Sequence, residues 1–292
     1  MVSPEPVRIS VVIPAFNEEA AIADTVRMTR GVFGSTGVAH EIIVVDDGSS
    51  DRTAEIAEQI DVAVVRLPQN GGYGTALKAG IRRAQYDWIA ILDADGTYPV
   101  DKFSKLMEFI PAFDMVVGAR TGRTYYGSYL KYPVRLLFKR LCEFVTGREI
   151  PDINSGMRLF RKDVAMRHFE RISGGFSFTT TLTLAMMMEG HFVKYVPVSY
   201  HPRIGKSHVK YIRDTLRAAQ IIIQAINFYN PVKLFVVLMA ASLLCSLAAV
   251  IGGVLWCFHP ALILLWAGLQ VALLLAGCGL IVEALRHNAP RK

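Results

Sequence analysis

The chain has 292 residues, of which 52% are hydrophobic and 20% charged, and its net charge is +7. Its length suits one medium domain with additional elements, or two small domains. The apolar content, the modest numbers of glycine and proline and the four cysteines exclude disordered, collagen-like and disulfide-scaffold proteins. The positive charge fits nucleic acid, an anionic membrane surface or a phosphorylated substrate, and composition does not choose among them.

Apolar strand-like runs alternate with helical segments through the first part of the chain. Strands are expected at 8–13, 41–45, 62–66, 88–92 and 196–200, and helices at 18–30, 50–59 and 73–84. Ser49 or Ser50 is expected to cap the second helix. This order predicts an α/β fold with a doubly wound, mostly parallel sheet, whose ligands gather at the carboxyl ends of the strands.

Polar side chains follow three of these strands. Asp93 and Asp95 come directly after the 88–92 strand, where two carboxylates can turn toward one point and hold Mg²⁺ or Mn²⁺ with substrate phosphates. A solvated turn is the alternative. Asp47 follows the second strand and can accept hydrogen bonds from a base or ribose, whereas Asp46 is expected to make a local turn.

Other segments have two interpretations each. Asn17 and Glu18 follow the first strand, and the simplest role for them is to serve the first helical turn. The segment 175–180 begins a further helix that could line the sugar or lipid side of a site, or could simply cap that helix over buried aromatic rings.

Two long uncharged stretches occupy the end of the chain, at 234–258 and 261–282. Each can cross a hydrocarbon core of about 30 Å at about 1.5 Å per residue. His259 and Pro260 separate them, which predicts a transmembrane helical hairpin; a pair of buried core helices is the alternative. The flanking cations place both ends in the cytoplasm by the positive-inside rule. These cations are Lys233, Arg286, Arg291 and Lys292.

The start of the chain lacks an apolar signal-peptide core, so the first domain is expected in the cytosol. The segment 211–228 reads as an amphipathic helix in the membrane interface, or alternatively as a surface helix on the soluble domain. The expected organisation is a catalytic domain, a juxtamembrane helix, two spans and a basic tail, in that order. The boundaries are 1–208, 209–230, 231–285 and 286–292.

Seven motifs follow one another along the chain, at 13–18, 45–49, 70–74, 93–95, 117–120, 151–156 and 203–207. In this order they resemble the family 2 glycosyltransferases of GT-A fold. The later motifs are similar to the branch of dolichyl-phosphate mannosyltransferases and bacterial polyprenyl-phosphate glycosyltransferases. The resemblance covers about residues 8–215, and the two-span tail matches many bacterial members. It implies a cytosolic nucleotide-diphosphate sugar as donor and a polyprenyl phosphate in the membrane as acceptor.

The resemblance assigns roles to individual residues. Asp93 and Asp95 hold the metal against the diphosphate, and Ala94 touches the nucleotide through its backbone. Phe16 stands where many members have tyrosine, so a hydroxyl contact is lost there. The residues that border the nucleoside are Pro14, Phe16, Glu18, Val45 and Asp47.

A second group of residues is assigned to the acceptor. Asp152 matches an acidic residue of this branch that orients the acceptor or lies near the metal, and it is counted with Asp93, Asp95 and Arg120 as catalytic. His208 stands where dolichyl-type enzymes often carry lysine. The expected phosphate-binding residues are Arg120, Arg135, Arg203, Ser207 and His208.

The implied reaction is transfer of one hexose, mannose or glucose, with inversion. A phosphate monoester is largely a dianion at pH 7, so a catalytic base is optional and cations are needed. A processive polysaccharide synthase is an alternative, but none of the three tryptophans follows an arginine, as that branch's Gln-x-x-Arg-Trp motif requires. A non-catalytic nucleotide-binding scaffold is another. Nucleic acid becomes the least favoured partner, and a homo-oligomer is left open.

Overall fold

The computed structural model describes residues 6–122, 132–170, 172–175, 177–201, 231–255 and 261–288. The chain divides into two compact units, Met1–Ala219 and Gln220–Lys292. The expected interface helix at 211–228 and the loop with Arg203, Ser207 and His208 lie outside the described residues.

The first unit is built on a seven-stranded sheet of order β3-β2-β1-β4-β6-β5-β7. Every neighbouring pair is parallel except those made by β6, which runs antiparallel to both β4 and β5. The α/β fold with a mostly parallel sheet is therefore confirmed. The strands are β1 (Arg8–Ala15), β2 (Ala39–Asp46), β3 (Ala63–Arg66), β4 (Trp88–Ile91), β5 (Met115–Thr121), β6 (Arg158–Arg161) and β7 (Val193–Ser199).

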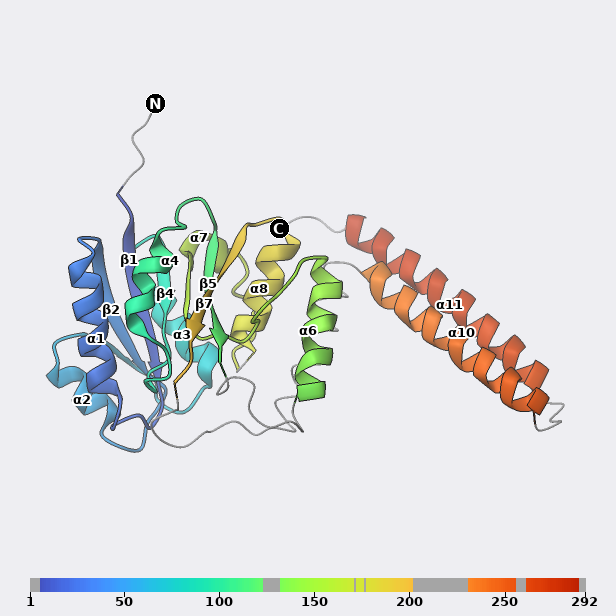
Figure 1. The fold of residues 1–292 in the computed structure, drawn as a ribbon, viewed down its shortest axis with the longest axis horizontal. Helices are drawn as coiled ribbons and strands as arrows, with labels where there is room; N and C mark the ends of the chain where they lie inside the picture. Colours follow the sequence, from blue (N-terminus) through green and yellow to red (C-terminus); the bar gives the residue numbers. More distant parts are fainter. Residues whose placement is uncertain are drawn as a thin grey trace, which may run out of the picture. The chain divides into compact units, whose positions relative to one another are not determined.

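Helices cover both faces of this sheet (Figure 1). Ile9, Val11 and Ile13 of β1 point into a core shared with α1, α2 and α4, whereas Val12 points into the core shared with α3, α7 and α8. Alternation along the strand thus divides its side chains between two layers. The helices of this unit are α1 (Ile22–Ser35), α2 (Thr53–Gln59), α3 (Tyr73–Arg83), the 3₁₀ turn η1 (Val100–Lys102), α4 (Phe103–Met107), α6 (Tyr132–Thr146), α7 (Lys162–Arg167) and α8 (Phe178–Met188).

The first two helices begin three or four residues later than the sequence pattern predicts. The polar residues before them join two loops instead of capping helices. Asn17 Oδ1 accepts a hydrogen bond from Ser50 N at 2.8 Å, and Asn17 N donates to Ser49 Oγ at 3.0 Å. The prediction that Ser49 or Ser50 caps the second helix is therefore wrong, because Asp51 Oδ1 accepts from Thr53 N there. Asn17 does not cap the first helix either.

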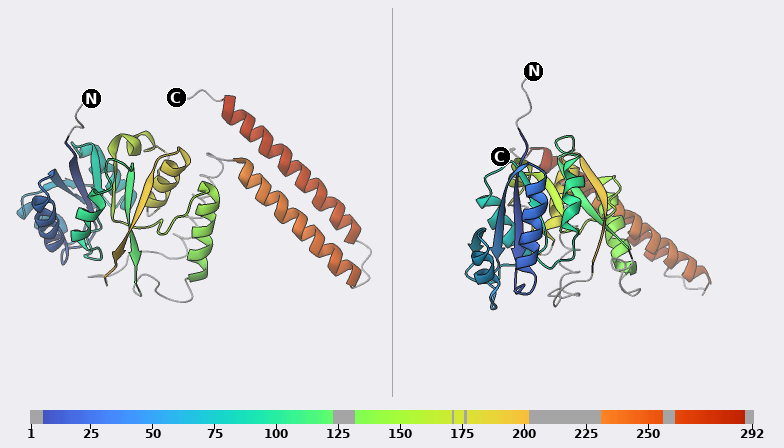
Figure 2. Two further views of the ribbon diagram at one scale, coloured as in Figure 1. Left: turned by 45° about the horizontal axis from the view of Figure 1, so that its top comes forward. Right: turned by 60° about the vertical axis from the view of Figure 1, so that its left-hand side comes forward.

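The second unit holds two long helices, α10 (Pro231–Leu255) and α11 (Ala261–Asn288), which pack side by side, as the left view of Figure 2 shows. Small residues allow the close approach: a Cβ on Gly268 would overlap Ser246, and one on Gly279 would meet Phe235. Ser242 Oγ also donates to the carbonyl oxygen of Gly268 at 3.1 Å.

Only one stretch in the described part of the chain is long and apolar enough to cross a membrane. It is Ile263–Val282 in α11, with a mean hydropathy of 2.1 and 11% of the stretch buried. The apolar stretch of α10, Phe235–Ile251, falls short of that length. The hairpin of helices is thus observed, and its crossing of a membrane at two places stays a prediction.

Candidate active site

The predicted motifs that follow β1, β2 and β4 meet at one edge of the sheet. β1 lies between β2 and β4, so the chain segments that leave these three strands are neighbours. Asp47 N donates to Ala15 O at 2.9 Å, which joins the ends of β1 and β2 directly. Asn17, Asp47 and Asp93 all follow these ends, as the carboxyl-edge rule predicts.

Asp47 holds the glycine-rich segment 70–74 in place. Its carboxylate is 4% exposed and accepts from Gly71 N at 2.8 Å and Gly72 N at 2.9 Å. Burial raises the pKa of Asp47, the two N–H donors oppose this effect, and the charge of Asp46 adds to it. Gly48 precedes this contact with φ +69, and a Cβ there would lie 2.6 Å from Gln69 C. Asp46 makes the expected local contact, accepting from Ser49 N at 3.3 Å.

Asp93 lies between a tyrosine hydroxyl and a glycine. Tyr73, the first residue of α3, donates its hydroxyl to Asp93 Oδ1 at 2.8 Å. Gly156 also lies against this carboxylate, because a Cβ on that residue would overlap the Asp93 carboxyl group. Asp93 itself is half-buried. The position of this carboxylate is therefore set by two segments far from it in the sequence.

Asp95 is held more locally. It is 6% exposed, and its Oδ1 accepts from Thr97 N at 3.1 Å and Thr97 Oγ1 at 2.6 Å. No group of three or more His, Cys, Asp or Glu side chains within metal-binding reach occurs among the described residues. Two carboxylates fit a Mg²⁺- or Mn²⁺-type ion that takes its other oxygen ligands from water and substrate phosphates.

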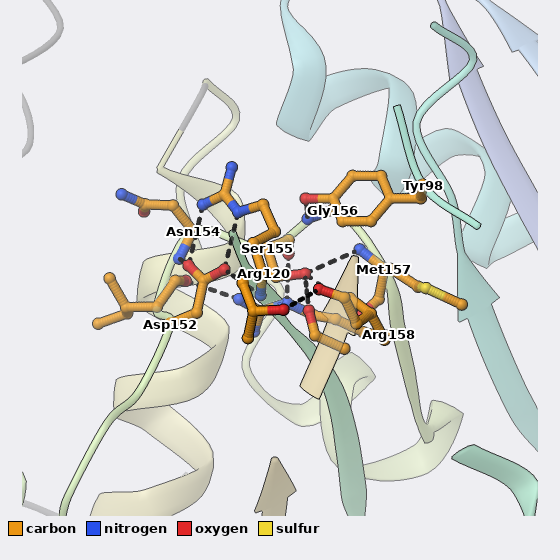
Figure 3. A network of polar contacts seen from close by, with 12 residues as sticks. Tyr98, Arg120, Asp152, Asn154, Ser155, Gly156, Met157 and Arg158 are labelled. Atoms are coloured by element: carbon orange, nitrogen blue, oxygen red, sulfur yellow. Dashed lines mark hydrogen bonds and ion pairs between the residues drawn. The ribbon is translucent and has the colours of Figure 1, made fainter. Parts of the chain in front are cut away.

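Arg120, near the end of β5, forms a bidentate ion pair with Asp152 (Figure 3). Arg120 Nε lies 2.7 Å from Asp152 Oδ2 and Nη2 lies 2.9 Å from Oδ1, and the backbone N–H of Arg120 also donates to Oδ2. The Arg120 side chain is 16% exposed and that of Asp152 only 2%. Burial alone would raise the pKa of the Asp152 carboxyl, but the charge and hydrogen bonds of Arg120 hold it below its ordinary value.

The segment 152–156 runs from this ion pair to Gly156 (Figure 3), and Gly156 lies against the Asp93 carboxyl group. Ser155 Oγ donates to Gly118 O at 2.6 Å, and Gly156 N donates to Tyr98 Oη at 2.7 Å. Asn154 Oδ1 accepts from Thr180 Oγ1 on α8 at 2.8 Å, which gives the 175–180 region a contact at the site. These hydrogen bonds fix the backbone of the segment between Asp152 and Gly156.

Arg158 binds the backbone of this segment through its guanidinium. Its side chain is fully buried on β6, where its guanidinium donates hydrogen bonds to uncharged oxygen atoms. Nε donates to Ser155 O and Nη2 to Ile153 O, while Nη1 donates to Thr179 O and Thr183 Oγ1 of α8. Burial lowers the pKa of this guanidinium, and nearby Asp152 and tyrosines oppose that effect. One arginine therefore connects the 152–156 segment to a helix.

Several of these residues were missed by sequence reasoning. Arg158 was detectable as one cation within the apolar run 157–160, and Tyr73 as an aromatic residue after paired glycines. Tyr98, which contacts Gly156 and stacks edge-on against Tyr200 with ring centroids 5.3 Å apart, had no signal. Tyr200 in turn lies under Arg120, 5.3 Å from its guanidinium carbon to the ring centroid.

The predicted nucleotide residues lie in or soon after β1, β2 and β4. Pro14, Val45 and Ala94 are buried, and Glu18 is 8% exposed. The carbonyl oxygen of Ala94 accepts from Thr25 Oγ1 at 3.0 Å, so this backbone group is already in use. On the acceptor side, the structure brings Arg120 and Asp152 together; the side chain of Arg135 and the residues Arg203, Ser207 and His208 lie outside the described part.

The chain is similar to several known proteins. The family model for glycosyl transferase family 2 matches residues 10–169. A dolichyl-phosphate hexose transferase of Haloferax volcanii is 31% identical over 206 residues, which is 68% of this chain and 85% of that protein. A low-salt glycan biosynthesis hexosyltransferase of the same organism is 31% identical over 215 residues.

Some relatives are much longer than the matched region. That hexosyltransferase is matched over 51% of its length and 72% of this chain. An undecaprenyl-phosphate 4-deoxy-4-formamido-L-arabinose transferase of Pseudomonas paraeruginosa is 34% identical over 53% of this chain and 48% of its own length. The chain therefore spans about half the length of these two relatives.

Solved structures share the fold. Glucosyl-3-phosphoglycerate synthase of Mycobacterium tuberculosis, bound to phosphoglyceric acid, matches with a TM-score of 0.62 and 19% identity over 75% of this chain and 80% of its own. The same protein with Mn²⁺, uridine diphosphate and glucosyl-3-phosphoglycerate matches with a TM-score of 0.58 at 20% identity, over 75% and 79%. At this level of identity the likeness establishes the fold.

Proposed function

Because the chain belongs to glycosyltransferase family 2, we propose that it transfers a single hexose from a nucleotide-diphosphate sugar to a polyprenyl phosphate. The observation that carries this proposal is the segment 152–156, because it contacts both a candidate metal ligand and an arginine. Gly156 lies against the Asp93 carboxylate, and Asp152 pairs with the Arg120 guanidinium. A carboxylate is needed to hold the metal ion that binds the donor diphosphate, and a guanidinium is needed to bind the acceptor phosphate. Relatives named for dolichyl-phosphate and undecaprenyl-phosphate sugars support the lipid acceptor.

On the donor side, Asp93 and Asp95 would hold Mg²⁺ or Mn²⁺. When bound, the ion would neutralise the charge that develops on the departing nucleoside diphosphate. Pro14, Phe16, Glu18, Val45 and Asp47 would border the nucleoside, as the family resemblance implies. Asp47 has a further task in this scheme, because its carboxylate also holds Gly71 and Gly72 in place.

On the acceptor side, Arg120 would bind phosphate, together with Arg135, Arg203, Ser207 and His208. The carboxylate of Asp152 accepts from Arg120 and from Asn154 N at 3.2 Å. Its lowered pKa makes it a poor proton acceptor at neutral pH, so Asp152 orients Arg120 and is not required as a base. A phosphate dianion then attacks the anomeric carbon in line, with inversion.

The second unit would anchor the enzyme to the cytoplasmic membrane. We place spans at about 234–258 and 261–282, an interface helix at 209–230, and the catalytic domain and both termini in the cytosol. The 25 residues of α10 extend beyond the ~30 Å hydrocarbon core at ~1.5 Å per residue, although its apolar stretch is short.

The test is an assay of membranes that contain the chain. They are incubated with polyprenyl phosphate, Mg²⁺ or Mn²⁺ and a panel of nucleotide sugars that includes mannose and glucose donors, and lipid-linked products are separated by chromatography. One sugar per lipid is expected, with the opposite anomeric configuration to the donor. No lipid-linked sugar with any donor would contradict the proposal, and a polymer would favour a processive synthase.

The paired substitution Asp93→Asn and Asp95→Asn separates the enzyme from a scaffold. An enzyme loses its product with this variant, whereas a nucleotide-binding scaffold keeps its cellular role. Asp101→Asn is the matched control, since Asp101 is an exposed carboxylate that pairs with Lys102 at the surface.

A further inference from the structure

Tyr73 is a polar side chain at the site to which the proposed reaction gives no task. It is the first residue of α3, directly after Gly71 and Gly72, and its hydroxyl reaches across to the segment that follows β4. The 2.8 Å contact with Asp93 Oδ1 has the ordinary length of an O–H···O hydrogen bond. Tyr73 therefore contacts a proposed metal ligand, although its own side chain carries no carboxylate that could bind the metal.

The backbone that carries Tyr73 is held on two sides. Asp47 binds the N–H groups of Gly71 and Gly72, and Thr75 N donates to Gly174 O at 2.8 Å. A side chain on Gly74 would overlap the segment 173–175, so the start of α3 lies directly against that segment. With its backbone held in this way, the tyrosine ring can deliver its hydroxyl to a defined point.

Asp93 has little freedom to turn away from that point. Gly156 lies against its carboxyl group so closely that no Cβ fits, and Gly156 N is itself bound by Tyr98. The backbone at Gly156 therefore limits rotation of the carboxylate, and the Tyr73 hydroxyl directs it. Groups that orient a metal ligand in this way commonly change metal affinity 10- to 100-fold when removed.

We propose that Tyr73 is a positioning residue, whose hydroxyl holds the Asp93 carboxylate in the orientation that binds the divalent cation. This inference rests on the proposed function, in which Asp93 is a metal ligand. It also connects a residue of the proposed nucleoside site to the proposed metal site. Asp47 binds Gly71 and Gly72, which directly precede Tyr73, and Tyr73 binds Asp93.

The experiment compares the wild-type full chain with Tyr73→Phe in detergent. Free Mn²⁺ is measured by electron paramagnetic resonance during titration, without nucleotide and with saturating uridine diphosphate. Binding of uridine diphosphate in EDTA is measured by calorimetry. Tyr86→Phe is the matched control, because it removes a hydroxyl from a ring that packs under Arg8 outside the site.

Tyr73→Phe should weaken Mn²⁺ binding about tenfold or more, with metal-free nucleotide binding unchanged and Tyr86→Phe like the wild type. Unchanged Mn²⁺ affinity in Tyr73→Phe would overturn the positioning role alone. An equal loss of nucleotide binding in EDTA would also overturn it, since the hydroxyl would then support the whole pocket. If the wild type binds no Mn²⁺, the metal assignment of the proposed function fails and this inference fails with it.

Discussion

Two buried aspartates of the site have pKa shifts of opposite sign, and their partners explain the difference. Asp152 faces a guanidinium, whose charge and hydrogen bonds outweigh the burial that would raise its pKa. Asp47 faces only backbone N–H groups and the like charge of Asp46, so burial prevails and its pKa rises. Ionisation of Asp152 thus favours the folded state as the pH rises, and ionisation of Asp47 disfavours it.

Asp152→Asn tests the first of these statements. The substitution leaves the largely buried Arg120 without its counter-charge, which should reduce the free energy of unfolding by about 3 kcal/mol at pH 7. Because the folded-state pKa of Asp152 is below the ordinary value of 3.8, the loss should persist down to about pH 5. It should shrink as the pH falls further and the wild-type carboxyl protonates.

The measurement is urea unfolding of the full chain across this pH range. Asp101→Asn is the control, because exposed ion pairs contribute about 0–1 kcal/mol. A deficit in Asp152→Asn that grows on acidification would contradict the assigned pKa direction.

Arg158→Lys should show what a buried guanidinium does that an ammonium cannot. The planar fork reaches carbonyl oxygens of the 152–156 segment and of α8 at once, and a single ammonium point cannot replace both sets. Acceptors left without donors in a buried site should lower stability by about 3 kcal/mol. Arg161→Lys, at the exposed end of the same strand, should stay within about 0.5 kcal/mol by the same unfolding measurement. An equal loss of stability in Arg158→Lys and Arg161→Lys would show that the buried hydrogen bonds of Arg158 do not account for its effect.

At the scale of elements, the antiparallel strand β6 is the feature that assembles the site. It enters the sheet between β4 and β5, and it pairs Ile91 with Arg158. The residues just before it are therefore delivered beside Asp93, which follows β4. A continuous βαβ pattern has no place for this strand, because each crossover helix returns the chain in the parallel direction.

Two glycine-to-alanine substitutions should have opposite outcomes. In Gly156→Ala the new methyl group displaces the Asp93 carboxylate, and a misplacement near 1 Å should cost about 100-fold in metal-dependent activity. In Gly31→Ala, on the exposed side of α1 with open space around it, the helix should gain about 0.5–1 kcal/mol.

Product formation and thermal unfolding of both variants check this pair. Gly156→Ala with wild-type activity would show that the carboxylate is free to shift. Gly31→Ala with a lowered melting temperature would show that α1 packs differently from its described geometry.

At the scale of the whole molecule, the apolar surface is concentrated in the second unit. Large side chains that are more than half exposed occur along α10 and α11, among them Leu244, Ile263 and Trp266. Exposed apolar rows of this length suit contact with lipid. The high overall hydrophobic content is thus not spread through the catalytic domain.

A topology experiment decides between one span and two. Alkaline phosphatase joined after Lys292 should be inactive and a fluorescent protein at the same place should be bright, because two spans return the chain to the cytosol. Alkaline phosphatase inserted between His259 and Pro260 should be active. An active C-terminal phosphatase would mean that α11 alone crosses the membrane.

Sequence patterns were sufficient for elements whose signal is local. β1, β2, β4 and α3 lie within a few residues of their predicted ranges, because apolar runs and paired glycines mark them directly. β5 and β6 were not predicted, since their places depend on pairing with strands far along the chain. The helix starts were misjudged for the same reason: Asn17 and Ser50 bind each other across 33 residues, and helix capping is only one of the uses open to such side chains.

The sequence by itself determined the α/β class, the family and the carboxylates at the ends of β2 and β4, because alternation and motif order are written in neighbouring residues. Only the tertiary structure decided that Arg120 is paired with Asp152, that Arg158 lies beneath the segment 152–156, and that Tyr73 and Gly156 flank Asp93. The contacts of Arg120 with Asp152 and of Asp93 with Tyr73 and Gly156 join residues 20 to 63 positions apart, and Arg158 also reaches Thr179 of α8. Such neighbours are created by the packing of the sheet and not by local pattern.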